Sequence, residues 1–258
     1  AMLEVSNVPL SYRGVQAIDD VSLTVAKGRI VGLIGTNGAG KTSLFNVISG
    51  FTRGDKGSIR FNGAAIENVR PSEIAQLGLV RTFQTPLGFP RMTVLENMLV
   101  FSRADAASRG RIFGRSKPDG AILEQAMATL DEFGLASRGN DLVQDLAAPE
   151  LKMLEFARAM MGDIKLLMLD EPAAGVNPAL LENLTSHIRS LRDRGVTFLV
   201  VDHNLKFISS VCEEIYAMAD GRVIAHGDSA DVIANPDVIR LYVGTGGADN
   251  SLSKEAEA

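Results

Sequence analysis

The N-terminal part of the chain alternates apolar and polar residues and then becomes continuously apolar. LEVSNV at residues 3–8 and AIDDVSLTV at residues 17–25 are apolar at about every second position. This period predicts half-exposed strands of an antiparallel sheet. RIVGLIG at residues 29–35 is apolar almost throughout, which is typical of a central strand buried on both faces. After it we expect a glycine-rich turn, a helix from Lys41 to about Ser49, and a short strand in GSIRFNG at residues 57–63.

The period changes to a helical one between Thr93 and Gly162. Thr93 and Glu96 form a capping box for a helix in TVLENMLV. DGAILEQAMATLDEFG, which ends at Gly134, has helical spacing, as does the second half of LAAPELKMLEFARAM at residues 146–160. Residues 102–118 hold five Arg or Lys and no clear period, so we interpret them as a loop with solvated charges.

Strands and helices alternate again in the last third of the chain. We expect strands in LLML and VTFLVV, a helix opened by Asn177 and Pro178 that reaches about Arg194, and a helix in LKFISSVC. EIYAMADGRVIAHG predicts a hairpin with its turn at Asp220 and Gly221. The predicted fold class is α/β, a mostly parallel sheet with an N-terminal antiparallel β subdomain and a helical insert. The expected division is a core of residues 2–92 and 163–243, a helical subdomain of residues 93–162, and a flexible tail of residues 244–258.

Composition and charge narrow the class of protein further. Of 258 residues, 46% are apolar and 22% are charged, which is ordinary for a globular chain and argues against disorder. The net charge of −5 argues against nucleic acid as a partner. The single cysteine, Cys212, excludes an intrachain disulfide and is expected in the core. No apolar run approaches the roughly 20 residues that span a bilayer.

GTNGAGKT, which follows the buried strand, matches the phosphate-binding pattern G-x-x-x-x-G-K-[ST]. Glycines let the backbone wrap so that several N–H groups point at one phosphate, and the following helix aims its positive dipole end at the same place. Lys41 would add a charge at the β- and γ-phosphates, and Thr42 would offer its hydroxyl to Mg²⁺. The predicted ATP-binding residues of this loop are Gly35, Thr36, Asn37, Gly38, Ala39, Gly40, Lys41, Thr42 and Ser43.

A second motif, LLMLDEP at residues 166–172, is a predicted buried strand that ends in two carboxylates. Asp170 would hold Mg²⁺, and Glu171 would polarise the water that attacks the γ-phosphate. The alternative is a strand that simply ends at a polar turn. Its position well over one hundred residues after the phosphate-binding loop favours the catalytic interpretation.

With these motifs in this order, the chain resembles the nucleotide-binding subunits of ABC transporters along nearly all its length. The resemblance implies that Gln84 in RTFQ contacts Mg²⁺ and senses a membrane partner, and that EPAAGVNP is the family's D-loop, with Asn177 where Asp is usual. It also implies that His203 in VDHN contacts the γ-phosphate and that Tyr12 stacks on adenine. Taken singly, each could be a solvated Gln, a structural His or a core Tyr.

Within the family, RTFQTPLGFPRMTVLENML, EPAAGVNP and IRLYVG most resemble the branched-chain amino acid importer group, to which urea and other amide importers belong. The resemblance implies a subunit on the cytoplasmic face of the cell membrane, membrane permease subunits as partners, and an external solute-binding protein as an indirect partner. The ATPase of lipopolysaccharide export is similar in these segments. A soluble ABC ATPase, such as one of iron–sulfur assembly, is the second alternative.

The segment before LEFARAM differs from the family's LSGGQ signature, which caps the γ-phosphate bound to the opposite subunit. It holds Leu146, Ala147, Ala148, Pro149 and Glu150. Pro149 has no N–H to donate. Glu150 brings an acid near a phosphate, and two like charges about 4 Å apart repel by on the order of 4 kcal/mol at an effective dielectric constant near 20. Proline and glutamate are also favoured in the first turn of a helix, so we expect these residues to be compatible with the fold.

From this signature we expect impaired recognition of the γ-phosphate across the dimer. ABC subunits pair head to tail, so a homodimer would place a poor signature in both sites. A second ABC ATPase subunit with an intact signature would leave one complete site on this chain's phosphate-binding loop. The sequence therefore favours an asymmetric heterodimer over a homodimer.

Overall fold

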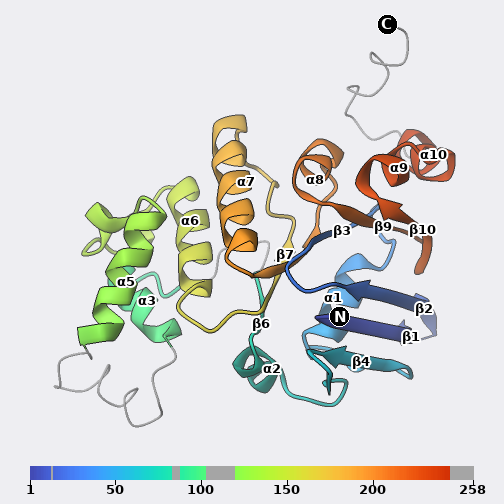
Figure 1. Ribbon diagram of the computed structural model, residues 1–258, viewed down its shortest axis with the longest axis horizontal. Coiled ribbons are helices and arrows are strands. Elements are labelled where there is room, and N and C mark those ends of the chain that lie inside the picture. Colours follow the sequence, from blue (N-terminus) through green and yellow to red (C-terminus); the bar gives the residue numbers. More distant parts are fainter. Residues whose placement is uncertain (13, 83–87, 103–119, 245–258) are drawn as a thin grey trace, which may run out of the picture.

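The computed structural model describes residues 1–12, 14–82, 88–102 and 120–244. It contains a six-stranded sheet, a four-stranded sheet and a group of helices (Figure 1). The six-stranded sheet has the order β10-β9-β3-β8-β7-β6. All neighbouring pairs in it are parallel except β9 with β10. Its strands are β3 (Ile30–Gly35), β6 (Leu79–Arg81), β7 (Leu166–Asp170), β8 (Thr197–Val201), β9 (Glu214–Ala219) and β10 (Arg222–Asp228).

The second sheet is antiparallel and has the order β2-β1-β4-β5. It confirms the half-exposed strands predicted at the N-terminal end, because β1 buries Leu3, Val5, Val8 and Leu10 and exposes residues between them. Its strands are β1 (Leu3–Tyr12), β2 (Val15–Val25), β4 (Ser58–Phe61) and β5 (Ala64–Ala65).

The central strands divide their side chains between two cores. Every residue of β3, β7 and β8 is buried, as the continuous apolar runs predicted. Successive side chains of a strand point to opposite faces, so Val31 and Leu33 face the antiparallel sheet and α1 (Lys41–Ile48), whereas Ile30 and Ile34 face α7 (Pro178–Asp193) and α8 (Leu205–Val211). This packing fixes the carboxyl end of β3, where the phosphate-binding loop begins, and the carboxyl end of β7, where Asp170 and Glu171 lie.

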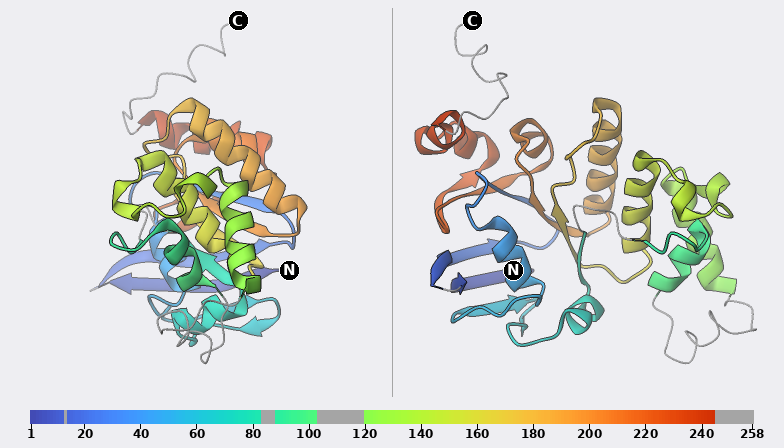
Figure 2. Two further views of the ribbon diagram at one scale, coloured as in Figure 1. Left: turned by 90° about the vertical axis from the view of Figure 1, so that its left-hand side faces the viewer. Right: turned by 180° about the vertical axis from the view of Figure 1, so that it is seen from behind.

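The helices α3 (Val94–Phe101), α5 (Gly120–Glu132) and α6 (Ala148–Ala159) lie together at the end of the molecule away from the antiparallel sheet (Figures 1 and 2). The predicted capping box starts α3: the Thr93 N–H donates to Glu96 Oε2 at 2.7 Å, and the Glu96 N–H donates to Thr93 Oγ1 at 3.1 Å. Gly134, with φ 69°, follows α5 as predicted. The predicted loop at residues 102–118 falls outside the described residues after Ser102.

The hairpin and the later helices also match their predictions. Asp220 and Gly221 have φ 47° and 75° in the turn between β9 and β10. Asn177 caps α7, where its Oδ1 accepts the Leu180 N–H, and Cys212 is buried. Several short elements were not predicted from the sequence, among them β5, β6, α2 (Pro71–Leu77), α9 (Ser229–Ile233) and α10 (Pro236–Gly244). Within the described ranges, none of the helices combines the length and apolarity that crossing a bilayer requires.

Candidate functional site

The loop between β3 and α1 needs glycine at specific positions. Gly35, Gly38 and Gly40 have φ of 151°, 85° and 98°, where a side chain would be strained. A Cβ on Gly35 would lie 2.4 Å from the Met218 carbonyl oxygen, and one on Gly40 would lie 2.4 Å from that of Ala17. Gly40 is the N-cap of α1 and has no side chain to cap it. The loop can therefore turn only with these glycines, and it leads directly into the N-terminus of α1.

Lys41 lies buried at the first position of α1. Its Nζ donates to the Gly35 carbonyl oxygen at 2.7 Å and to that of Thr36 at 2.9 Å, so the ammonium group sits inside the curve of the loop. Burial lowers the pKa of Lys41, and the nearby carboxylates of Glu171 and Asp170 oppose that shift. Thr42, the next residue, is exposed and therefore accessible to a ligand. An ammonium group and an exposed hydroxyl at a helix N-terminus suit a phosphate with its metal ion.

Tyr242 of α10 contacts the same loop, which the sequence analysis did not foresee. The Gly35 N–H donates to the Tyr242 hydroxyl at 3.0 Å. Burial raises the pKa of Tyr242 to about 12, against the lowering effect of this hydrogen bond, so the group stays neutral at physiological pH. The last described helix thus supports the start of the phosphate-binding turn.

Asp170 and Glu171 lie side by side in sequence but in different environments at the end of β7. Asp170 is buried and its Oδ2 pairs with Arg81 at 2.7 Å. Glu171 has φ 49°, an uncommon conformation for a residue other than glycine, and its N–H donates to the Val201 carbonyl oxygen at 2.8 Å. The left-handed backbone turns the chain sharply where β7 ends, and both carboxylates lie near enough to Lys41 to act on its ammonium group.

His203 and its neighbour Asp202 follow β8, the strand beside β7. The His203 side chain is 60% exposed, and its Nδ1 lies 3.8 Å from Asp202 Oδ1. Asp202 is fully buried and accepts the backbone N–H groups of Ala173 and Asn204, each at 2.9 Å. Asp202 thus ties the segment after Glu171 to the turn that carries His203. The sequence analysis missed it, although it lies inside the VDHN motif.

Two further residues, Tyr12 and Gln84, were predicted to belong to the site. Tyr12 is 44% exposed at the end of β1, with its hydroxyl 3.5 Å from Thr52 Oγ1, so its ring is accessible to a planar group. Gln84 lies outside the described residues.

The segment from Leu146 to Glu150 forms the start of α6. Ala147 is the N-cap, and its N–H donates to Glu150 Oε2 at 2.8 Å. Glu150 Oε1 lies 3.6 Å from Arg138 Nε. Pro149 occupies the second helical position, where no intrahelical N–H bond is lost. Pro149 and Glu150 therefore lie in the first turn of a helix, as the sequence predicted.

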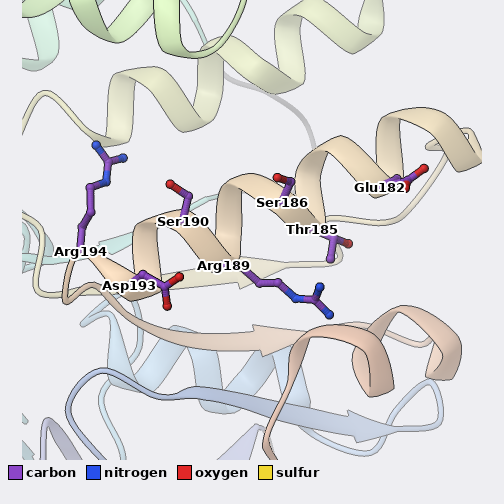
Figure 3. Close-up of a pocket in the computed structure, with 7 residues that line it drawn as sticks. All are labelled: Glu182, Thr185, Ser186, Arg189, Ser190, Asp193 and Arg194. Atoms are coloured by element: carbon purple, nitrogen blue, oxygen red, sulfur yellow. The ribbon is translucent and has the colours of Figure 1, made fainter.

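A pocket elsewhere on the molecule does not coincide with these groups. Figure 3 shows side chains that line it projecting from α7. Arg194 is already bound to Glu132, at 2.6 Å, and Arg189 donates to the Ser210 carbonyl oxygen. None of the predicted nucleotide residues lines it, so we assign it no role. The lining residues are Glu182, Thr185, Ser186, Arg189, Ser190, Asp193 and Arg194.

Known proteins resemble this chain in sequence and in structure. The model of the family described as "ABC transporter" matches residues 18–174. The probable branched-chain amino acid transport ATP-binding protein LivG of Archaeoglobus fulgidus is 42% identical over 94% of this chain and 95% of its own. The high-affinity branched-chain amino acid transport ATP-binding protein LivG of Escherichia coli K12 is 35% identical over 94% and 98%. The crystal structure of the ADP conformation of MJ1267, an ATP-binding cassette of an ABC transporter, aligns with a TM-score of 0.84 at 32% identity, over 94% of this chain and 98% of its own.

Proposed function

The chain belongs to the ABC transporter family and is an ATP hydrolase of that type, and from this premise we propose that it energises an importer of branched-chain amino acids or a related small polar solute such as urea. The observation that carries the proposal is the 42% identity with a branched-chain amino acid transport ATP-binding protein over almost the full length of both chains. The intact loop from Gly35 to Thr42 and the carboxylates at the end of β7 support it.

The residues present suit Mg²⁺ bound together with ATP. Asp170 Oδ1 is buried and has no hydrogen-bond partner among the described residues, so this oxygen is available to a metal ion or its water. No cluster of three or more His, Cys, Asp or Glu side chains that could hold a metal occurs in the described ranges, and Mg²⁺ with ATP is held mainly by phosphate oxygens, water and one or two carboxylates. Thr42, Asp170 and Gln84 would hold the ion, which would neutralise phosphate charge when bound.

The other predicted residues take complementary roles in this proposal. Lys41 neutralises the β- and γ-phosphates, and the N–H groups of the loop donate to the phosphate oxygens. Glu171 orients and polarises the attacking water, His203 contacts the γ-phosphate, and Tyr12 stacks on adenine. We also propose that the chain is divided into a nucleotide-binding core (residues 2–92 and 163–243), a helical signature subdomain (residues 93–162) and a tail (residues 244–258).

We also propose that the chain works in an asymmetric heterodimer with a second ABC ATPase subunit. Pro149 offers no N–H, and Glu150 presents a carboxylate that already serves the N-cap of α6. A signature of this kind is a weak donor to a γ-phosphate on the opposite subunit. A partner with an intact signature would complete the site that includes Lys41 and Glu171.

The purified chain alone is therefore expected to hydrolyse ATP slowly and without cooperativity. Replacing Pro149 by glycine and Glu150 by glutamine restores one N–H donor and removes a negative charge, so we expect the rate to rise on the order of tenfold. A phosphate-release assay measures both proteins, and Glu182→Gln on the exposed face of α7 is the control. Rapid, cooperative turnover by the unmodified chain would rule out the impairment.

The transport role predicts membrane partners for the subunit. As a peripheral protein on the cytoplasmic face, the tagged chain should retain two permease subunits when purified from a detergent extract of its native membranes. An external solute-binding protein would act with them indirectly. Purification with soluble proteins only would favour an ABC ATPase without a channel. Transport assays in vesicles separate import from a lipopolysaccharide-type export.

A further inference from the structure

We propose that Arg81 is a positioning residue that holds the Asp170 carboxylate in the orientation in which it receives Mg²⁺. This inference rests on the proposed ATP and Mg²⁺ site. It concerns a residue of β6, the edge strand that the sequence analysis did not foresee, and the evidence is the set of contacts made by its guanidinium group.

Arg81 reaches Asp170 from the neighbouring strand. β6 and β7 are parallel, with Arg81 paired to Met168, so Arg81 lies near the carboxyl end of β7. Its Nη2 donates to Asp170 Oδ2 at 2.7 Å, and the two side chains are only 6% and 5% exposed. The Asp170 N–H in turn donates to Thr82 Oγ1 at 3.4 Å. The end of β7 is therefore held by two successive residues of the adjacent strand segment.

The same guanidinium group is fixed to the helix that begins with Lys41. Arg81 Nη1 donates to Asn46 Oδ1 at 2.6 Å and to Ser49 Oγ at 3.3 Å. Its guanidinium carbon lies 5.5 Å from the centre of the Phe45 ring, within range of a cation–π interaction. The planar guanidinium fork, with five donors in a fixed geometry, suits simultaneous bonds to a carboxylate and to two oxygen acceptors on another element. Arg81 thus connects the phosphate-binding helix to the carboxylate at the end of β7.

This arrangement leaves the two Asp170 oxygens unequal. Oδ2 is bound to Arg81, whereas Oδ1 is buried and has no hydrogen-bond partner among the described residues. A buried ion pair contributes little to stability compared with apolar side chains of the same volume, so stability alone does not explain it. Side chains that orient a metal ligand typically affect metal affinity 10- to 100-fold. Arg81 therefore fixes Oδ2 and leaves Oδ1 as the oxygen that would bind a metal ion.

The test compares the affinity of a fluorescent ATP analogue in EDTA and in excess Mg²⁺. For Arg81→Met we expect affinity in EDTA within about twofold of the original protein, and a Mg²⁺-dependent gain in affinity about tenfold smaller. Arg81→Lys should recover the gain only in part, since a compact ammonium group lacks the planar fork that spans Asp170 and α1. Arg194→Met, which removes a surface ion pair with Glu132, should leave both values unchanged.

Asn46→Ala keeps the ion pair but removes the shortest hydrogen bond between the guanidinium group and α1, and it serves if Arg81→Met does not fold. Asn46→Ala should also lower the Mg²⁺-dependent gain in affinity, but by less than Arg81→Met does. An unchanged gain in the folded variants, or a larger one because Arg81 competes with the metal for Asp170, would overturn this inference. If the original protein itself gained no affinity from Mg²⁺, the proposed nucleotide site would fail instead.

Discussion

Glu171→Gln is expected to keep Mg²⁺-ATP binding and to reduce turnover by about 10²- to 10⁴-fold, the range for loss of a general base. Glutamine has nearly the same shape but cannot accept a proton from water at neutral pH. The position should tolerate it, because the contacts that hold the φ 49° backbone are made by the main chain, to Val201 and Ala174. The fold and the nucleotide site should therefore survive, and only the chemical step should suffer.

Two measurements separate binding from chemistry in this variant. Nucleotide affinity is measured by fluorescence, and turnover by phosphate release from the reconstituted complex of the chain with its partner subunits. Glu182→Gln, an exposed change on α7, is the matched control and should behave like the original protein. Normal hydrolysis by Glu171→Gln would show that another group activates the water.

Lys41→Ala is expected to weaken ATP binding by about 10- to 100-fold. A hydrogen bond to a charged group contributes about 1.5–3 kcal/mol, which is 10- to 150-fold in an equilibrium constant. In the structure the ammonium group is buried and is held in the loop by the carbonyl oxygens of Gly35 and Thr36. Its site is therefore prepared before any phosphate arrives, and alanine supplies neither the charge nor the donors.

The measurement is equilibrium binding of Mg²⁺-ATP with a thermal melt of each protein to verify folding. Lys27→Ala, which removes an exposed lysine before β3, is the control and should leave affinity unchanged. Retention of Mg²⁺-ATP at the original affinity by a folded Lys41→Ala protein would contradict the assignment of the loop to the phosphates.

Features that depend on neighbouring residues could be predicted from the sequence. Each such feature lies within one helix or strand. Examples are the alternation of apolar and polar residues in β1 and β2, the continuous apolar runs of β3 and β8, and the capping box of Thr93 and Glu96. The phosphate-binding loop is equally local, because its glycines and Lys41 lie within one turn. β6, with three residues, and α9, with five, are too short to show a clear period, and they were missed for that reason.

Relations between distant segments were decided by the tertiary structure. Arg81 and Asp170 are 89 residues apart, and Gly35 and Tyr242 are 207 apart. They meet because β6 lies at the edge of the sheet beside β7, and because α10 returns to the start of the loop. The order of strands in a parallel sheet depends on how long crossovers pack, which no local pattern encodes. The sequence alone determined which residues we propose for phosphate and metal binding, because those motifs are local, whereas the packing of strands and helices decided which distant side chains contact them.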